Sequence, residues 1–213
     1  MRKKAVQTAI EHPLEEDLWN QHELILGMDE AGRGPLCGPL TVAGVIFEKG
    51  YRNPLLNDSK KLSEKRREQL ALQIMEDALA YQILFIDEQT IDELNIYQAS
   101  REGMETIADH LQADWIITDA MPLQRHPNHQ AEIKGDARSI SIAAASILAK
   151  TARDRYMMEL DREYPQYGLA RHKGYPTRAH LEAIDQYGVQ SFYRRSYGPV
   201  QRILSREQQE TLF

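Results

Sequence analysis

Four short apolar runs along the chain have the length and composition of buried strands, and a fifth segment of mixed character reads as a short strand. Each is bounded by Gly, Pro, acidic or other polar residues, which interrupt regular structure or mark its end. Most of the runs are rich in Val, Ile, Thr and aromatic side chains, which favour strands. They cover residues Leu24–Met28, Thr41–Phe47, Tyr81–Ile86, Trp115–Thr118 and Ala131–Lys134.

Between and after these runs, apolar residues recur every three or four positions, which is the spacing of one helix face. One such segment continues from Ile96 to Leu111, and a long Ala-rich one contains the sequence SIAAASILAK. Several residues have the side chains and spacing of helix caps. These are Ser63, Thr90 with Glu93 as a capping box, Ser139 or Ser141, and Thr177, whose helix would end at Gly188.

The order of elements is three strands, helices, two strands and then helices. Early hairpin-like strands followed by a helical crossover predict a mixed five-stranded α/β sheet flanked by helices, with a small helical C-terminal part. Residues 1–22 read as an arm or short helix, and residues 23–213 as one domain. The segment after Val200 reads either as a tail or as a partner-binding helix.

A glycine-rich turn joins the first two strands, and it carries the most informative chemistry of the chain. Asp29 and Glu30 stand side by side before it, and adjacent carboxylates are costly to hold together unless a cation lies between them. Gly32 and Gly34 leave backbone N–H groups open to phosphate or sugar oxygens, and Arg33 adds a bidentate phosphate donor. An exposed hairpin loop with ordinary surface acids is the alternative reading.

Four acids stand just past predicted strand ends: Asp29, Glu30, Asp119 and Asp136. In open α/β sheets the ligand crevice lies outside the carboxyl ends of the strands. Asp29 and Asp119 would be neighbours there if their strands pair in parallel. Ligands that are all oxygen favour Mg²⁺ or Mn²⁺ over Zn²⁺. The alternative for an Asp at a strand end is a turn former.

Composition bounds the remaining possibilities. The chain has 213 residues, 42% of them hydrophobic and 27% charged, which suits a globular protein with a real core. A single cysteine excludes an internal disulfide, and no apolar run approaches the roughly 20 residues of a membrane span. We therefore expect a cytoplasmic protein with no membrane contact. The net charge is −6, but residues 150–202 hold ten Lys and Arg against six Asp and Glu, which is compatible with a nucleic-acid groove.

The turn and three further segments resemble one known family. The sequence DEAGRGPLCGP is similar to the signature of the ribonuclease HII family, which usually reads DEAGRGPLAGP, so that Cys37 replaces an Ala. DSKKL, KGD before SIAAASILAK, and HKGYPT also match, and the resemblance extends from about Leu24 to Val200. We read Cys37 as a packing residue rather than a nucleophile, because no acid–base pair accompanies it.

The resemblance implies a ribonuclease-H-like fold and a metal-dependent endoribonuclease. Such an enzyme hydrolyses the RNA strand of RNA–DNA hybrids and nicks 5′ of ribonucleotides embedded in duplex DNA, leaving 3′-hydroxyl and 5′-phosphate ends. The family's catalytic and metal-binding acids match Asp29, Glu30, Asp119 and Asp136. Two divalent ions, Mg²⁺ or Mn²⁺, are expected there during catalysis. We read Asp154 as a helix-surface partner for nearby arginines.

The resemblance also assigns substrate contacts. Gly32, Arg33, Gly34 and Tyr175 match the residues that meet the RNA–DNA junction, although Pro176 stands where Gly is common. The alternative for Tyr175 is half-buried packing. Other candidates for contacts with the nucleic-acid backbone are Lys60, Ser139, Ser141 and Lys150, of which the two serines are at a helix N-terminus. We expect the protein to act as a monomer.

Three rival functions remain to be weighed. A non-catalytic hybrid-binding module would be expected to lose an acid, and none is missing. The second rival is a ribonuclease HIII-like enzyme. Members of that family have an added N-terminal domain and a Glu as their fourth acid, so the short segment before the first strand and Asp136 argue against this rival. A nucleotide-binding protein that uses the glycine-rich turn as a phosphate loop would need a Gly-Lys-Ser/Thr pattern, which the turn lacks.

Overall fold

The computed structural model describes residues 10–56 and 63–210, so the prediction for Lys60 lies outside the described residues. The strands are β1 Ile25–Ala31, β2 Leu40–Ile46, β3 Ala80–Ile86, β4 Trp115–Asp119 and β5 His129–Glu132. The α-helices are α1 Glu15–Leu18, α2 Glu64–Asp77, α3 Glu88–Leu94, α4 Ile96–Leu111, α5 Ile140–Glu163, α6 Leu169–His172, α7 Arg178–Tyr187 and α8 Gly198–Glu210. Two 3₁₀ turns, η2 Gly135–Ala137 and η3 Pro165–Tyr167, precede and follow α5.

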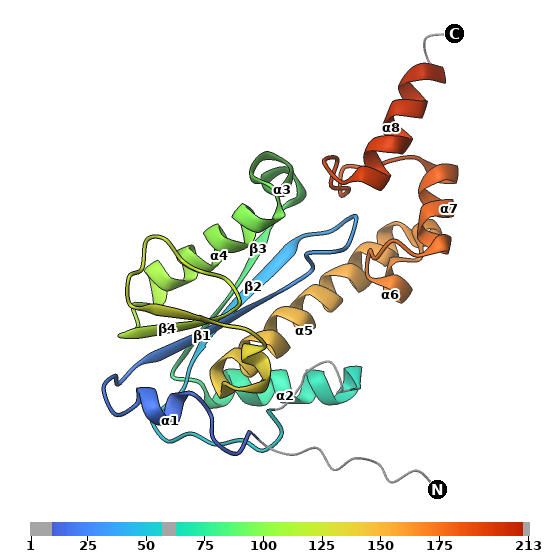
Figure 1. Ribbon diagram of the computed structural model, residues 1–213. Coiled ribbons are helices and arrows are strands. Elements are labelled where there is room, and N and C mark those ends of the chain that lie inside the picture. Colours follow the sequence, from blue (N-terminus) through green and yellow to red (C-terminus); the bar gives the residue numbers. More distant parts are fainter. Residues whose placement is uncertain (1–9, 57–62, 211–213) are drawn as a thin grey trace, which may run out of the picture. The chain divides into compact units, whose positions relative to one another are not determined.

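The strands form one mixed five-stranded sheet, as predicted (Figure 1). The order of the strands in the sheet is β3-β2-β1-β4-β5. β1 pairs in parallel with β4, and β4 pairs in parallel with β5. β1 begins one residue later and ends three residues later than the predicted run, because the strand continues through the acids to Ala31. β5 begins and ends two residues earlier than predicted. The adjacent acids of the glycine-rich turn therefore belong to a strand and not to a surface loop.

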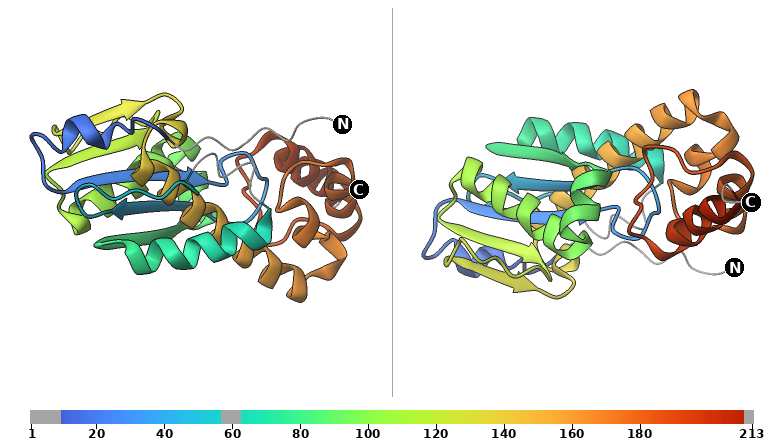
Figure 2. Two further views of the ribbon diagram at one scale, coloured as in Figure 1. Left: turned by 90° about the horizontal axis from the view of Figure 1, so that it is seen from below. Right: turned by 90° about the horizontal axis from the view of Figure 1, so that it is seen from above.

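Helices cover both faces of the sheet. Figure 2 shows α1, α2 and the beginning of α5 over one face and α4 over the other. The first five residues of β1 and the whole of β2 are buried without alternation, which is the pattern of strands covered on both sides. A Cβ on Gly27 of β1 would lie 2.4 Å from the Cβ of Ser141 in α5, so only glycine permits this approach of helix to strand.

The predicted caps of α2 and α7 are confirmed, and the cap predicted for α3 is wrong. Ser63 accepts from the N–H of Arg66 at the start of α2, and Thr177 accepts from the N–H of His180 at the start of α7. The capping box of Thr90 with Glu93 does not form. Asp87 caps α3 instead, and its carboxylate accepts from the N–H of Thr90 at 2.8 Å. A carboxylate at this position also complements the positive end of the helix dipole.

The chain divides into two compact units. The first contains Met1–Glu30, Val42–Leu84 and Arg101–Thr151, and therefore most of the sheet; the second contains Ala31–Thr41, Phe85–Ser100 and Ala152–Phe213. α5 begins in the first unit and ends in the second. The separation of an arm of residues 1–22 from a domain of residues 23–213 stays a prediction. Over the residues that the structure describes, no helix combines the length and the apolar character needed to cross a membrane.

The second unit has its own apolar core, in which aromatic rings from α7 and the segments around it meet. Tyr167 packs edge-on against Phe192, and Phe192 contacts Tyr193. His180 is buried among them, with one ring nitrogen 3.0 Å from the Tyr193 hydroxyl and the other 2.9 Å from the Tyr175 carbonyl. Burial lowers the pKa of His180 to about 4, so the ring is neutral and packs as part of the core at physiological pH.

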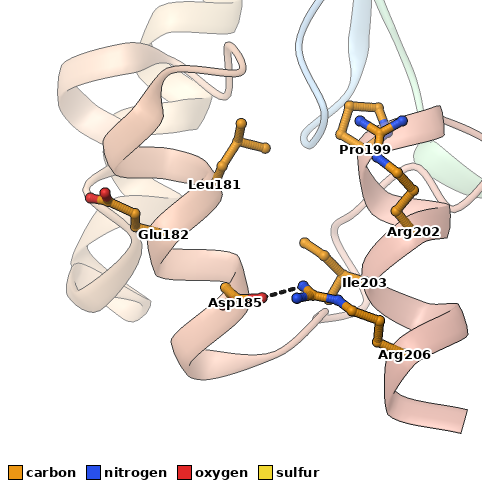
Figure 3. A pocket seen from close by; sticks show the side chains of 7 residues that line it. All are labelled: Leu181, Glu182, Asp185, Pro199, Arg202, Ile203 and Arg206. Atoms are coloured by element: carbon orange, nitrogen blue, oxygen red, sulfur yellow. Dashed lines mark hydrogen bonds and ion pairs between the residues drawn. The ribbon is translucent and has the colours of Figure 1, made fainter. Parts of the chain in front are cut away.

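An open pocket lies between α7 and α8 in the second unit. Figure 3 shows Leu181 and Ile203 as its apolar lining, and an ion pair between Asp185 of α7 and Arg206 of α8 that joins the two helices. The ion pair is exposed, so it contributes little to stability.

Candidate active site

The parallel pairing of β1 with β4 places two of the predicted acids side by side. Met28 is in register with Thr118, so Asp29 and Asp119 occupy the next position on the two strands. In-register side chains of parallel strands point to the same face of a sheet. Asp29 is only 7% exposed. The observed parallel pairing is the condition under which we predicted that Asp29 and Asp119 would be neighbours.

The fourth acid reaches the same edge through the turn after β5. Asp136 is buried in the 3₁₀ turn η2, which follows Lys134 in a left-handed conformation. The N–H of Gly135, its neighbour in that turn, donates to a carboxylate oxygen of Asp119 at 2.9 Å. This bond holds the turn that carries Asp136 against the end of β4.

The electrostatics of the site show an excess of negative charge. The pKa of Asp29 lies well above its ordinary value, first because of burial and then because of the neighbouring charges of Glu30 and Asp119. Two hydrogen bonds oppose this shift, one from Ser146 of α5 and one from the N–H of Glu30 at 2.7 Å. Carboxylates that raise each other's pKa in a buried site attract a compensating cation.

These residues fit a divalent cation by donor type and by charge. All four side chains offer oxygen, the ligand that Mg²⁺ and Mn²⁺ prefer. Within residues 10–56 and 63–210, no three His, Cys, Asp or Glu side chains already converge as ligands of one ion.

The glycine-rich turn belongs to the second unit, where buried arginines hold its backbone. The guanidinium of Arg153 donates to the carbonyl oxygens of Pro39 at 3.0 Å, Cys37 at 3.0 Å and Lys173 at 2.9 Å. Gly32 has a φ of +102°, and a Cβ there would lie 2.1 Å from Nε of Arg153. Glycine is thus required at this position both by its backbone angle and by the arginine behind it.

Arg194 holds the same turn from another segment. It is fully buried, and it donates to the carbonyl oxygens of Gly38 at 2.8 Å, Pro35 at 2.9 Å and Arg33 at 3.2 Å. Because backbone carbonyls of the turn point to buried guanidinium groups, the shape of the turn is fixed from inside the unit. Sequence reasoning missed both arginines, since their carbonyl partners in the turn are more than 100 residues away in the chain.

Tyr175 packs against this turn. A Cβ on Gly34 would lie 3.3 Å from the ring of Tyr175, so the ring contacts the glycine backbone. The N–H of Leu36 donates to the carbonyl of Gly174 at 2.8 Å, which fixes the two segments together. Tyr175 is 46% exposed and Arg33 is also exposed. The second unit therefore presents an aromatic ring, a glycine backbone and a cation on one short stretch of surface.

Cys37 is fully buried beneath this turn, with its sulfur 3.9 Å from Nε2 of His180. Burial raises the pKa of its thiol to about 12, so the reactive thiolate is absent at neutral pH.

We expect Cys37→Ala to leave kcat and KM within about twofold of the parent, because the thiol supplies packing only; the cost in stability should be about 1 kcal/mol. Steady-state cleavage assays and thermal unfolding measure the two effects. Rapid alkylation of the folded parent, or loss of activity in the variant at full helicity, would contradict this reading of the residue.

The remaining residues that we predicted to contact the nucleic-acid backbone differ in how far they are buried. Ser139 and Ser141 are buried, and their partner is the Glu15 carboxylate, so the predicted phosphate contacts gain no support from the structure. Ser139 does cap α5, since its hydroxyl accepts from the N–H of Ile142 at 3.0 Å. Lys150 is half-buried on α5. Asp154 is buried at 6% exposure and not on the helix surface as expected, because this face of α5 packs inward.

Comparisons with known proteins identify the family of the chain. The family model of ribonuclease HII matches residues 26–200. The ribonuclease HII of Francisella tularensis subsp. mediasiatica is 51% identical over 185 residues, which cover 85% of this chain and 99% of the relative.

Solved structures of two related enzymes have the same fold as this chain. The ribonuclease H2 of Pyrococcus horikoshii superimposes with a TM-score of 0.75 at 26% identity, over 87% of this chain and 99% of that one. The ribonuclease HII of Archaeoglobus fulgidus, solved in complex with PCNA, gives a TM-score of 0.71 at 28% identity, over 84% of this chain and 96% of that one. The chain belongs to the ribonuclease HII family, and this membership supports ribonuclease H activity.

Proposed function

We propose that this chain is a metal-dependent endoribonuclease that hydrolyses the RNA strand of RNA–DNA hybrids. We further propose that it nicks duplex DNA 5′ of embedded ribonucleotides and leaves 3′-hydroxyl and 5′-phosphate ends. The observation that carries the proposal is the acidic edge of the sheet, where Asp29, Glu30 and Asp119 interact and the turn of Asp136 is bonded to Asp119. None of the four acids that the family requires is missing, which disfavours a non-catalytic binding module.

Each acid has a part in this proposal. Asp29, Glu30, Asp119 and Asp136 would hold the divalent ions, Mg²⁺ or Mn²⁺. When bound, such ions activate a water molecule and stabilise the leaving oxygen of a phosphodiester. The protein's own contribution is orientation: Ser146 and the N–H of Glu30 hold the Asp29 carboxylate, and the N–H of Gly135 holds that of Asp119. Preorganised carboxylates need little rearrangement when the substrate arrives.

Substrate selection belongs to the second unit in this proposal. Phosphate contacts position a nucleic acid but do not distinguish RNA from DNA, so some group must sense the 2′-hydroxyl. Gly34 is exposed and has no side chain, so a sugar can approach its backbone closely, and the exposed ring of Tyr175 offers a flat face to the next sugar. Gly32 keeps the shape of the turn, because Arg153 occupies the space beside it. Arg33 and Lys150 supply positive charge for phosphates, and we propose that the protein acts as a monomer.

A cleavage assay tests the reaction. The substrate is a labelled duplex DNA that carries one ribonucleotide, incubated with Mg²⁺, with Mn²⁺ or with EDTA, and the cut is mapped at single-nucleotide resolution. We expect one nick on the 5′ side of the ribonucleotide, in the presence of either metal only. An all-DNA duplex of the same sequence is the control. Cleavage in EDTA, or no cleavage of any hybrid, would refute the proposed function.

A protein partner is suggested by one relative, since the Archaeoglobus enzyme was solved in complex with PCNA. We propose that this chain binds a sliding clamp of the same class through the segment after Val200. That segment contains Leu212 and Phe213, an adjacent apolar pair of the kind that anchors short peptides in a partner's pocket.

Deletion of residues 209–213 should abolish binding to the purified clamp while kcat on free duplex stays within twofold. Gln201→Ala is the control, because Gln201 lies earlier on α8 and outside the deleted residues. This variant should bind the clamp as the parent does. Clamp binding by the truncated chain with unchanged affinity would show that the segment has no part in it.

A further inference from the structure

Glu15, in the four-residue helix α1, has a buried carboxylate that accepts hydrogen bonds on both of its oxygens. It is fully buried, and one oxygen accepts from the Ser139 hydroxyl at 2.6 Å and from the Ser141 N–H at 2.8 Å. The other oxygen accepts from the Ile140 N–H at 3.3 Å. Glu15 lies outside residues 26–200, to which the family model applies. A buried carboxylate is costly unless its hydrogen bonds are satisfied, and here they are.

The donors of these bonds are the first groups of α5, a helix of 24 residues. A helix N-terminus has unpaired N–H groups and a partial positive charge, both of which favour an anion. The chain fills this position with its own Glu15. The backbone supports the contact, because the N–H of Leu14 donates to the carbonyl of Arg138 at 2.9 Å. The segment before the sheet is thus fastened to the beginning of α5.

The same beginning of α5 is joined to the acidic edge of the sheet. The N–H of Ser139 donates to the carbonyl of Gly135 at 2.8 Å, and the N–H of Gly135 donates to Asp119 at 2.9 Å. Asp136 lies in that turn. Two helical turns further on, Ser146 of α5 bonds to Asp29. Glu15 therefore stabilises the one helix end on which the positions of three acids depend.

We propose that Glu15 is a positioning residue for the metal-binding acids. Its carboxylate fixes the first turn of α5, and that turn holds η2 with Asp136 and the amide that orients Asp119. The inference rests on the proposed function, since it concerns the affinity of the same site for divalent ions. It also assigns the serines at the helix start to an internal anion, and not to a substrate phosphate.

The test compares Glu15→Ala, Glu15→Gln and the control Asp17→Asn, whose side chain is exposed on the same short helix. Mn²⁺ binding is measured by calorimetry without substrate, and kcat and KM are measured on the single-ribonucleotide duplex. Loss of an orienting group around a metal site typically weakens affinity about 10- to 100-fold. We expect that loss in Glu15→Ala with KM for the duplex within twofold, partial recovery in Glu15→Gln, and parent values in Asp17→Asn.

The outcomes separate the two proposals. If the parent binds Mn²⁺ and cuts, but folded Glu15→Ala does both as well as the parent, only the positioning role is overturned, even when its melting temperature is lower. If Glu15→Ala does not fold, Glu15→Gln decides, because a neutral side chain of the same size should still lower Mn²⁺ affinity severalfold; parent affinity there overturns the inference. If the parent neither binds Mn²⁺ nor cuts, the proposed function fails.

Discussion

Asp29→Asn should lower kcat by more than about 1000-fold, equivalent to about 4 kcal/mol of transition-state stabilisation. Asp29 is buried beside Asp119 and Glu30, so its charge cannot be replaced by solvent or by a neighbouring acid without rearrangement. An amide keeps the size and one oxygen but removes the charge that would hold a divalent ion. Single-turnover cleavage of the ribonucleotide-containing duplex at saturating Mg²⁺ measures the loss.

The same substitution should raise stability in metal-free buffer. Burial and two neighbouring carboxylates raise the pKa of Asp29, so the folded protein holds this proton at pH values where the unfolded chain has released it. Stability from this group is therefore present at low pH and falls as the pH rises above the ordinary Asp range. Asn cannot ionise, so the melting temperature of the variant should exceed that of the parent near pH 7 and equal it near pH 4.

An exposed acid provides the control for both measurements. Glu76→Gln on α2 removes one negative charge from the same unit but lies on the surface, so turnover and metal-free stability should stay near the parent values. Turnover of Asp29→Asn within tenfold of the parent would remove the acidic edge of the sheet from the proposed mechanism. If the melting temperature of Asp29→Asn without metal is lower than that of the parent, the hydrogen bonds of Asp29 stabilise the fold more than its repulsion from Glu30 and Asp119 destabilises it.

Tyr175→Ala should lower cleavage at a single embedded ribonucleotide by roughly 30- to 1000-fold, the equivalent of about 2–4 kcal/mol from lost packing and one or two hydrogen bonds. The ring is exposed and packs on the Gly34 backbone, so it is available to a substrate sugar without movement of the chain. Binding to duplex should change much less, because phosphate contacts supply most of the affinity. Cleavage rates and equilibrium binding on the same oligonucleotide separate the two effects.

Two further variants locate the source of the effect. Tyr175→Phe keeps the ring and removes the hydroxyl, so a rate between those of the parent and the Ala variant would assign part of the loss to a hydrogen bond. Tyr81→Ala, at a similarly exposed tyrosine on β3, should cut at the parent rate. The junction-reading role fails if Tyr175→Ala cuts the single-ribonucleotide duplex at the parent rate, or if the parent needs several consecutive ribonucleotides.

The apolar pattern predicted four of the strands closely, because β1 to β4 contain short, dense apolar runs, whereas β5 is the polar segment His129–Glu132. It failed at the end of β1, where Asp29 and Glu30 look like a strand terminus but continue the strand pairing. Polar residues inside a strand are expected at a functional site, where local preference and global fold disagree. The cap of α3 was missed for a different reason, since both Asp87 and Thr90 are suitable caps and only the backbone decides between them.

The parts of the site that could not be predicted all depend on contacts between distant segments. Nothing near Glu15 in the sequence indicates that its carboxylate is buried against residues 139–141. Arg153 and Arg194 read as ordinary surface cations, because a fully buried arginine is rare unless its donors are paired. Their partners in the turn are backbone carbonyl oxygens. Every residue has a backbone carbonyl, so no residue type in the sequence marks these partners.

The buried guanidinium group of Arg153 makes the shape of the glycine-rich turn insensitive to pH near neutrality. Burial and the neighbouring Arg194 lower the pKa of Arg153, but only to about 10, so it still carries its proton at any pH where a nuclease is assayed. A histidine or a carboxylate in the same place would release or bind a proton within that range and loosen the turn. The pH–rate profile of this protein should therefore report on the acids and the attacking water alone, while discrimination between RNA and DNA stays constant across it.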